Sequence, residues 1–286
     1  MQLWSIEGNR QHLDGGSMFG NAPRALWQRW HKADENHRIE LATRCLLAKD
    51  LLNRNVLFEA GMGAFLSPKL ADRFGINEID HRLLLSLDAA GISHEDIDAV
   101  VLSHLHFDHC GGLFSPYETD KPMRLLFPNA RFFISEAAWH TANSPHIRDK
   151  PSFIPEQIQM LTESGRVELV GGARHPYFAD AVQFEFSNGH TQGLMLAELH
   201  GKQRISFASD LIPGTTWVKP NITMGYDRFP ELAIDEKIAY LNDKVERNVS
   251  IFYTHDPAYA ISNVAQDEDG NYVSCNEVAA IENFAL

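Results

Sequence analysis

His104-Leu105-His106-Phe107-Asp108-His109 is the most informative stretch of this 286-residue chain. It places three imidazoles and a carboxylate within six residues, directly after the apolar run Ala99–Leu102. These groups are the nitrogen and oxygen ligands that Zn²⁺ and related divalent ions prefer. On an extended backbone His104 and His106 point to the same side, whereas Asp108 and His109 follow at a turn. One ion rarely takes four ligands from six consecutive residues, so the spacing predicts two neighbouring metal ions.

The histidine cluster also has a plainer interpretation. The chain contains 14 histidines, so a group of them can arise by chance on a surface loop. Two features favour a metal site instead: the cluster ends a predicted buried strand, and it runs into Gly111-Gly112.

The wider pattern Ser-His-x-His-x-Asp-His-x-Gly-Gly, which starts at Ser103, resembles the signature of the metallo-β-lactamase superfamily. Three later blocks resemble the remaining ligand blocks of that superfamily, in the expected order. They are Gly189–Gly193, Phe207–Asp210 and Phe252–Asp256. Ser209 stands where Gly is usual, and Thr254 precedes a histidine that often follows Gly. The resemblance spans most of the chain.

Carried over residue by residue, this resemblance implies two groups of metal ligands that share one carboxylate. The first metal ion would be held by His104, His106 and His190, the second by Asp108, His109 and His255, and both by Asp210. We expect two divalent ions, with zinc first and manganese, iron or cobalt as alternatives. Such a pair would hold a bridging hydroxide that attacks an ester or phosphoryl centre.

Two of the implied ligands, Asp108 and Asp210, are also the predicted catalytic residues. Asp210 would bridge the ions, and Asp108 would either act as a ligand alone or also protonate the leaving oxygen. Glu59 stands where the family usually has Asp near the site, which leaves its role open. Cys110 adjoins the motif and is expected to be a small packed residue rather than a ligand.

A narrower resemblance lies near the N-terminus. Asp14–Gly20, followed by Pro23 and Trp27, resembles the start of the quorum-quenching acyl-homoserine lactonase branch, which methyl parathion hydrolase-like proteins share. Met224–Asp227 resembles the same subgroup. This implies a lactonase or esterase that acts on apolar lactones, acyl-homoserine lactones among them. The alternatives are a phosphotriesterase, arylesterase or phosphodiesterase of the same fold, and a non-catalytic metal-binding regulatory protein.

Aromatic residues are candidates for the substrate pocket. Phe107, Trp217 and Tyr226 are predicted to line it, with Trp217 against the substrate tail; a place in the core is the alternative for Trp217. The segment Met18–Trp30 is rich in apolar residues, and in the branch it resembles, this region contributes to a dimer and to the pocket rim. We therefore expect a homodimer, with packing into the chain's own core as the alternative.

Composition restricts the partners. The net charge is −13 and the pI is near 5.5, which disfavours nucleic acid as a partner, because phosphate backbones need Lys and Arg contacts. Three widely spaced cysteines indicate free thiols in a reducing compartment. No apolar run approaches the roughly 20 residues of a membrane helix. The first residues do not combine a basic segment with a following apolar stretch, so we expect no signal peptide. We expect a soluble cytoplasmic protein whose partner is a small-molecule substrate.

The periodicity of apolar residues predicts a mixed chain of strands and helices. The predicted strands are Ile39–Leu47, Asn55–Phe58, Ala99–Leu102, Arg131–Ile134, Val167–Val170, Val182–Phe186, Leu194–Leu199, Ile205–Ala208 and Ser250–Tyr253. Helices are predicted at Ile79–Ala90 and Pro230–Val245, and a hairpin around residues 267–271. This pattern indicates an α/β or α+β layered fold. The family resemblance sharpens it to an αββα sandwich of two mixed sheets, as one domain over residues 1–286 with an insertion at about 114–166.

Overall fold

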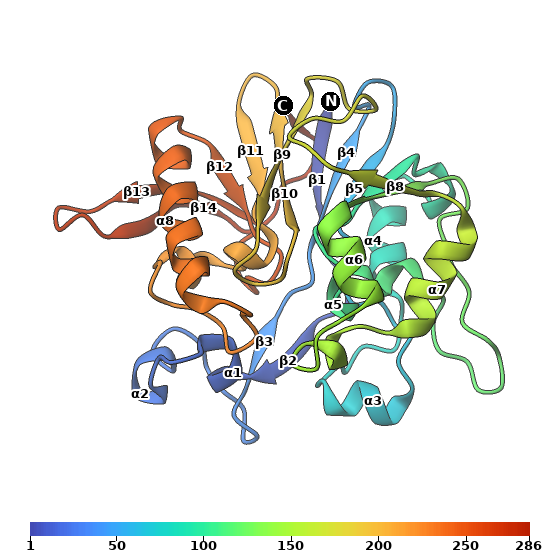
Figure 1. Ribbon diagram of the computed structural model, residues 1–286, viewed down its shortest axis with the longest axis horizontal. Helices are drawn as coiled ribbons and strands as arrows, with labels where there is room; N and C mark the ends of the chain where they lie inside the picture. Colours follow the sequence, from blue (N-terminus) through green and yellow to red (C-terminus); the bar gives the residue numbers. More distant parts are fainter.

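The computed structural model describes residues 1–286 and places two facing sheets between outer helices (Figure 1). The first sheet has seven strands in the order β15-β1-β4-β5-β6-β7-β8. Its strands are β1 (Gln2–Ile6), β4 (Cys45–Lys49), β5 (Val56–Phe58), β6 (Ala99–Val101), β7 (Arg131–Ser135), β8 (Val167–Val170) and β15 (Phe284–Ala285). Strands β5 to β8 are parallel to one another, whereas β4 pairs antiparallel with both β1 and β5, so the sheet is mixed.

The second sheet has six strands in the order β14-β13-β12-β11-β10-β9. Its strands are β9 (Val182–Ser187), β10 (Leu194–His200), β11 (Arg204–Phe207), β12 (Ser250–Phe252), β13 (Ile261–Gln266) and β14 (Tyr272–Val278). Only the pair β11–β12 is parallel. A separate two-stranded sheet joins β2 (Gln11–Asp14) to β3 (Arg38–Leu41).

Helices cover the outer face of each sheet. The α-helices are α1 (Gly15–Phe19), α2 (Arg24–Trp27), α3 (Pro68–Arg73), α4 (Arg82–Ala89), α5 (Phe107–Cys110), α6 (Glu136–Asn143), α7 (Pro155–Ser164) and α8 (Pro230–Glu246). In Figure 1, α4, α6 and α7 flank the first sheet and α8 flanks the second. The predicted sandwich of two mixed sheets between helices is confirmed.

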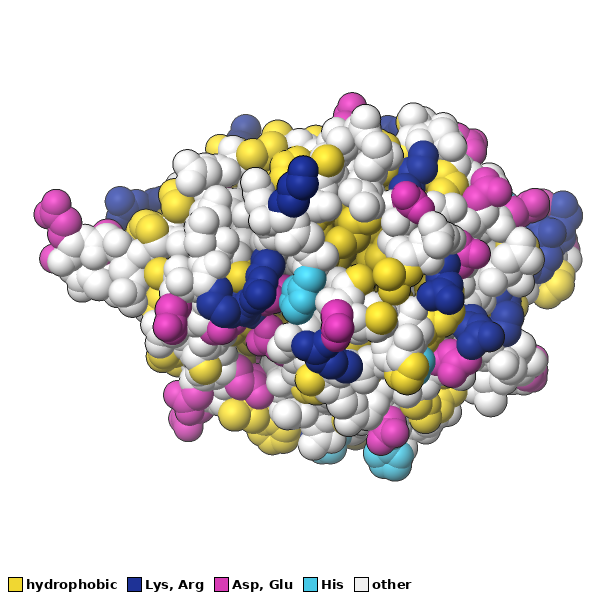
Figure 2. Space-filling view, turned by 90° about the horizontal axis from the view of Figure 1, so that it is seen from above, with side chains coloured by type: hydrophobic (Ala, Val, Ile, Leu, Met, Phe, Trp, Pro, Cys, Tyr) yellow, Lys and Arg dark blue, Asp and Glu magenta, His cyan; other side chains and the backbone are white.

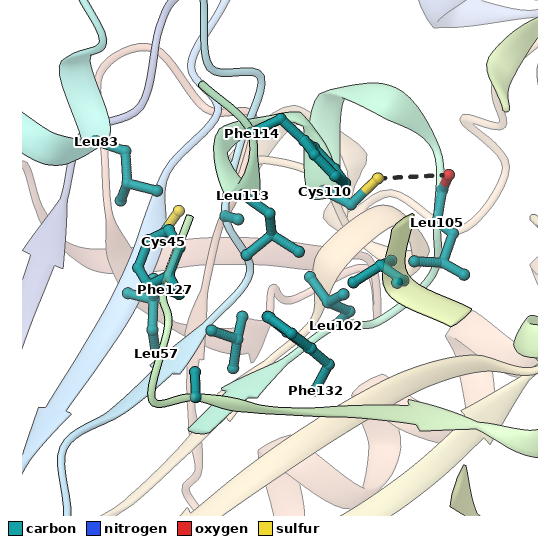
Figure 3. Close-up of a cluster of buried hydrophobic side chains, with 14 of the residues drawn as sticks. Cys45, Leu57, Leu83, Leu102, Leu105, Cys110, Leu113, Phe114, Phe127 and Phe132 are labelled. Carbon is teal, nitrogen blue, oxygen red and sulfur yellow. Dashed lines mark hydrogen bonds between the residues drawn. The ribbon is translucent and has the colours of Figure 1, made fainter. Parts of the chain in front are cut away.

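Alternation along the strands of the first sheet supplies two of the three cores. Phe58 and Val101 face the second sheet and belong to the cluster between the sheets. Leu57 and Val100, one residue earlier, point to the opposite face and belong to the cluster under the helices, with Leu83 of α4 (Figure 3). Full burial of such side chains contributes about 1.5–3 kcal/mol each. A third cluster lies between the second sheet, α8 and the N-terminal helices.

The prediction of one strand over Ile39–Leu47 is wrong, because the run forms β3 and β4 in different sheets. The residues between them leave the strand to bind another segment. Backbone N–H groups of Ala42 and Arg44 donate to the carbonyl oxygens of His255 and Thr254, at 3.3 and 2.8 Å. These hydrogen bonds connect the first sheet to the loop after β12.

Most other predicted elements are present. The helix expected at Ile79–Ala90 is shorter, since α4 starts at Arg82, and Ile79 is 89% exposed. The helix expected at Pro230–Val245 is α8, and the expected hairpin is β13–β14, closed by Asp267. The single-domain assignment and the insertion at residues 114–166 stay predictions; β7, α6 and α7 lie within that segment.

The chain termini and the end of β6 lie at opposite ends of the sandwich. Strands β5 and β6 run in the direction of β1, so β6 ends away from the face that carries the chain termini. Figure 2 shows the termini face, where hydrophobic side chains gather near the middle among charged ones. None of the helices combines the length and apolar character that crossing a bilayer requires.

A buried ion-pair network joins α8 to β10. The carboxylate of Glu198 accepts hydrogen bonds from both terminal nitrogens of Arg247, at 2.7 and 2.6 Å, and from Lys244 Nζ at 3.0 Å. Burial alone would raise the pKa of Glu198, but hydrogen bonds from Arg247 and Lys244 lower it to about 2. The group therefore stabilises the folded chain most fully above its ordinary pKa of about 4.5.

We predict that Glu198→Gln lowers the free energy of unfolding by about 1.5–3 kcal/mol at pH 7, because it removes a buried charge that binds both Lys244 and Arg247. Asp243 still pairs with both cations, which limits the loss. Since the folded pKa is lowered, the loss should shrink as the pH falls from about 4.5 towards 2. Urea unfolding at several pH values measures this. Glu246→Gln, an exposed change on the same helix, is the control and should have little effect. Equal losses for both variants would contradict the role of the network.

Candidate metal centre

The seven predicted ligands lie at one end of the sandwich, on four loops that follow strand ends. They are His104, His106, Asp108 and His109 after β6, His190 after β9, Asp210 after β11 and His255 after β12. The first ligand of each loop stands three residues beyond its strand. Their donor atoms form two groups close enough to share an ion: His104, His106, His190 and Asp210; and Asp108, His109 and His255. Glu59 forms a third such group with His104 and His109.

Glycines allow the first loop to fold this tightly. Gly112 packs so closely on the backbone of Ala60 that an added Cβ would lie 1.9 Å from its carbonyl oxygen. Any side chain at Gly112 would therefore push α5 and its ligands away from the first sheet. Gly111 is equally restricted, since its Cβ would lie 2.2 Å from the Met62 carbonyl oxygen, so both positions need glycine.

The carboxylate of Asp210 lies between the two predicted groups. Its Oδ2 is 3.2 Å from His190 Nε2 and 3.3 Å from His109 Nε2, and its Oδ1 is 3.2 Å from His255 Nε2. His104 Nε2 is farther, at 3.9 Å. Asp210 thus faces histidines of both groups, as the bridging position requires.

Several of these atoms are buried without a hydrogen-bond partner. His104 Nε2, His106 Nε2 and Asp210 Oδ1 are all in this state. Unpaired buried polar atoms are costly, and a shared cation would satisfy lone pairs that face one another. Burial lowers the pKa of His104, and it lowers that of His106 to about 3, so both rings are neutral and able to bind metal. The donor set fits divalent metal ions.

A surrounding layer fixes the orientation of the imidazole rings, and sequence reasoning did not identify its members. Three Nδ1 atoms face fixed partners: His104 faces Ser103 Oγ at 2.8 Å, His190 faces Asp227 Oδ1 at 2.9 Å, and His255 faces the Ala42 carbonyl at 2.7 Å. Asp227 is itself held by the N–H of Met224 at 2.8 Å. Such partners set the tautomer and leave Nε2 free for a metal ion.

Glu59 belongs to this layer behind His109. Its Oε1 lies 3.6 Å from His109 Nδ1 and accepts hydrogen bonds from Ser103 N at 3.1 Å and Ser209 Oγ at 3.4 Å. Glu59 and Ser209 both have positive φ, at 65° and 44°. Backbone strain of this kind concentrates at functional sites. Glu59 therefore supports the cluster through its contacts with His109 and Ser209.

Asp108 and Cys110 have different surroundings although both adjoin His109. Asp108 reaches the cavity and accepts a hydrogen bond from Gln11 Nε2 at 2.7 Å. Cys110 points into the core under the helices, with its Sγ 3.7 Å from the Leu105 carbonyl (Figure 3). It belongs to none of the donor groups. All three cysteines are free.

The cluster opens into a cavity of about 160 Å³. Its walls are formed by Leu13, Met18, Arg73, Phe74, His106, Phe107, Asp108, Pro151, Ser152, His190, Asp210, Met224, Tyr226 and His255. Phe107 and Tyr226 were predicted to line a substrate pocket, and both lie here. Met18 and Met224 belong to the two stretches that resemble the lactonase branch, but neither was assigned to the pocket individually. Leu13 and Phe74 lie outside the motifs.

Trp217 does not lie in this cavity. Its side chain is fully buried in the third core cluster, stacked on Phe19 at 4.7 Å between ring centroids. Its Nε1 donates to the Met18 carbonyl at 3.1 Å, so it supports the cavity wall from behind. Met18, Phe19 and Trp27 are buried in the same cluster, as the alternative for the N-terminal segment expected. The homodimer stays a prediction without support from these residues.

Family comparison agrees with this geometry. Residues 46–185 match the model of the metallo-β-lactamase superfamily. The chain carries a metallo-β-lactamase superfamily domain. The predicted superfamily is thereby confirmed, and the fold is that of metal-dependent hydrolases. No curated protein matches the sequence.

Solved structures share this fold over nearly the whole chain. A probable metal-dependent hydrolase from Staphylococcus aureus is 25% identical, with a TM-score of 0.84 over 96% of this chain and 97% of that one. AidC, a dizinc quorum-quenching lactonase in complex with a product, is 22% identical, with a TM-score of 0.77 over 96% and 94%. An N-acyl homoserine lactone hydrolase with N-hexanoyl-L-homoserine at its catalytic metal centre is 18% identical, with a TM-score of 0.66 over 90% and 93%.

We predict that Asp210→Ala weakens binding of both metal ions, because its carboxylate faces histidines of both groups. Elemental analysis of protein purified without chelator should find about two divalent ions in the wild type and fewer than one in the variant. Asp269→Ala, in the exposed turn between β13 and β14, is the control and should keep two ions. An Asp210→Ala protein that retains two ions would contradict the bridging position.

We also predict that Trp217→Ala lowers the free energy of unfolding by about 3–5 kcal/mol, the cost of a large cavity in a core. Thermal and urea unfolding measure the change. Trp139→Ala, at a half-buried position on α6, is a matched control and should cost less. Near-native stability, together with a KM effect that grows with the substrate's tail length, would place the indole against the substrate instead.

Proposed function

We propose that this protein is a dinuclear metal-dependent hydrolase of lactones or esters with apolar tails, and that its native ions are zinc. The observation that carries the proposal is the seven-ligand cluster opening directly into a cavity with apolar walls. The neighbouring structures named above include two lactone-hydrolysing enzymes, which supports the reaction class. Acyl-homoserine lactones are one substrate group within this proposal.

The residues of the chain divide the work between holding ions and handling protons. A pair of bound divalent ions supplies a nucleophile from water near neutral pH and polarises the reacting oxygen. His104, His106 and His190 would hold one of the two ions, and the surrounding hydrogen bonds keep these rings in place. The side chain of Asp108 is more exposed to the cavity than that of Asp210, at 14% against 7%.

Asp108 is therefore positioned to pass a proton to the leaving oxygen. Its Oδ2 is held by Gln11, which fixes the carboxylate at the cavity edge. In this role the carboxylate would take the proton that the attacking water loses and give it to the leaving oxygen. A role as metal ligand alone remains the simpler assignment for Asp108, and the experiment below separates the two.

The cavity walls favour an apolar acyl chain over a highly charged phosphate. Met18 and Met224 line the cavity, and Phe74 packs on Phe107 at 4.8 Å between ring centroids. Methionine side chains are flexible and adapt to differing ligand shapes. The walls provide few polar groups besides the ligands, as is usual for sites that bind small apolar molecules.

A substrate panel with metal-replete protein tests the proposal. We predict that lactones and p-nitrophenyl esters with alkyl tails are hydrolysed with higher kcat/KM than a phosphotriester or a phosphodiester. Asp210→Ala should abolish turnover of every substrate. Asp108→Asn should slow poorly activated leaving groups more than p-nitrophenolate if Asp108 donates the proton. A preference for phosphotriesters would reassign the substrate class, and no turnover at full metal content would favour a regulatory metal-binding protein.

A further inference from the structure

Arg73 is the one cationic wall residue of the metal-centre cavity other than its histidines. It is the last residue of the short helix α3 and is solvent-exposed. The next residue, Phe74, is tied to β2 by a hydrogen bond from His12 N to the Phe74 carbonyl at 3.0 Å. This places the guanidinium on a fixed backbone at the wall that also contains Phe74 and Phe107.

The guanidinium of Arg73 has no carboxylate partner, whereas three other arginines near this end of the fold do. Those are paired: Arg38 with Asp34, Arg82 with Glu78 and Arg228 with Asp149, each at 2.8 Å. Arg73 instead lies 5.9 Å from the Phe74 ring centroid. In a chain with 38 acidic and 25 basic residues, an unpaired arginine beside the candidate active site is a distinctive feature.

The position of Arg73 in the cavity wall indicates which part of a substrate its charge would meet. The predicted ligands occupy one part of the wall, and apolar side chains occupy most of the rest. A substrate that binds its ester at the metal centre extends its tail along these apolar side chains. Arg73 is the wall group that can then meet a negative charge on the tail, since a planar guanidinium binds carboxylates in paired hydrogen bonds.

We propose that Arg73 is a specificity residue that selects esters or lactones whose apolar tail carries a terminal carboxylate. This inference rests on the proposed hydrolase function and names a narrower substrate class for the same site. An ordinary role for Arg73 is to stabilise the C-terminal end of α3, where a cation is favourable. That role predicts a change in stability but no discrimination between neutral and anionic substrates.

The first experiment compares matched substrates that differ only in a terminal carboxylate: p-nitrophenyl hexanoate and mono-p-nitrophenyl hexanedioate. We expect Arg73→Gln to lower the anionic-to-neutral ratio of kcat/KM by about three- to tenfold, mainly through KM, because an exposed ion pair is modest in strength. Arg73→Lys should keep part of the preference. Arg124→Gln removes an exposed arginine elsewhere and should leave the ratio unchanged. The wild-type preference should also weaken with added salt.

The second experiment uses binding rather than turnover. Calorimetry compares hexanoate with hexanedioate, which adds a second carboxylate to the end of the tail that lies away from the metal centre. We expect tighter binding of the dicarboxylate to the wild type, and loss of that advantage in Arg73→Gln. A series from four to eight carbons identifies the tail length that fits.

The outcomes separate this inference from the proposed function. Turnover of neutral esters with an unchanged anionic-to-neutral ratio in Arg73→Gln, and no advantage for the dicarboxylate, would overturn the role of Arg73 and leave the hydrolase intact. A lower melting temperature with an unchanged ratio would assign Arg73 to the stability of α3. No turnover of any ester or lactone by metal-replete protein would overturn both.

Discussion

The carboxylate of Asp210, buried among imidazoles of both ligand groups, is the constraint on which the rest of the structure depends. A buried polar cluster is costly unless its groups are paired or bind a cation. Each ligand must therefore be held close to the others, although the ligands come from segments up to about 150 residues apart in the sequence. The two-sheet sandwich meets this requirement because all four ligand loops leave strand ends on the same side.

The cost of assembling the cluster is spread over the surrounding backbone and side chains. Ala42 and Arg44, at the break between β3 and β4, hold the His255 loop by backbone hydrogen bonds. Glu59 and Ser209 adopt positive φ to reach the cluster from two different sheets. Neither contact contributes to a regular strand or helix. They fix the positions of the rings, which is a requirement of chemistry rather than of folding.

The cavity differs from the cluster in origin. Its polar end consists of the predicted ligands, but its apolar walls come from β2, α1, the residue after α3, the start of α5 and the loop before α8. Trp217 supports this wall without entering the cavity, since its indole stacks on Phe19 and bonds the Met18 carbonyl. The walls can therefore vary while the metal cluster stays the same, which is how one fold serves different substrates. Arg73 occupies such a wall position.

The sequence predicted the layered fold, most strand positions and the ligands His104–His109, because local periodicity and a dense His/Asp motif are readable without tertiary contacts. Through its resemblance to the superfamily, the sequence also implied His190, Asp210 and His255 as ligands. It misplaced the boundary in Ile39–Leu47, since the break depends on bonds to a loop more than 200 residues away. It also placed Trp217 in the pocket, with the core as the alternative, because a pocket aromatic and a core aromatic look the same in sequence. Only the tertiary structure decided the roles of Glu59, Asp227 and Arg73, because each is defined by what it faces across the fold rather than by its neighbours in the chain.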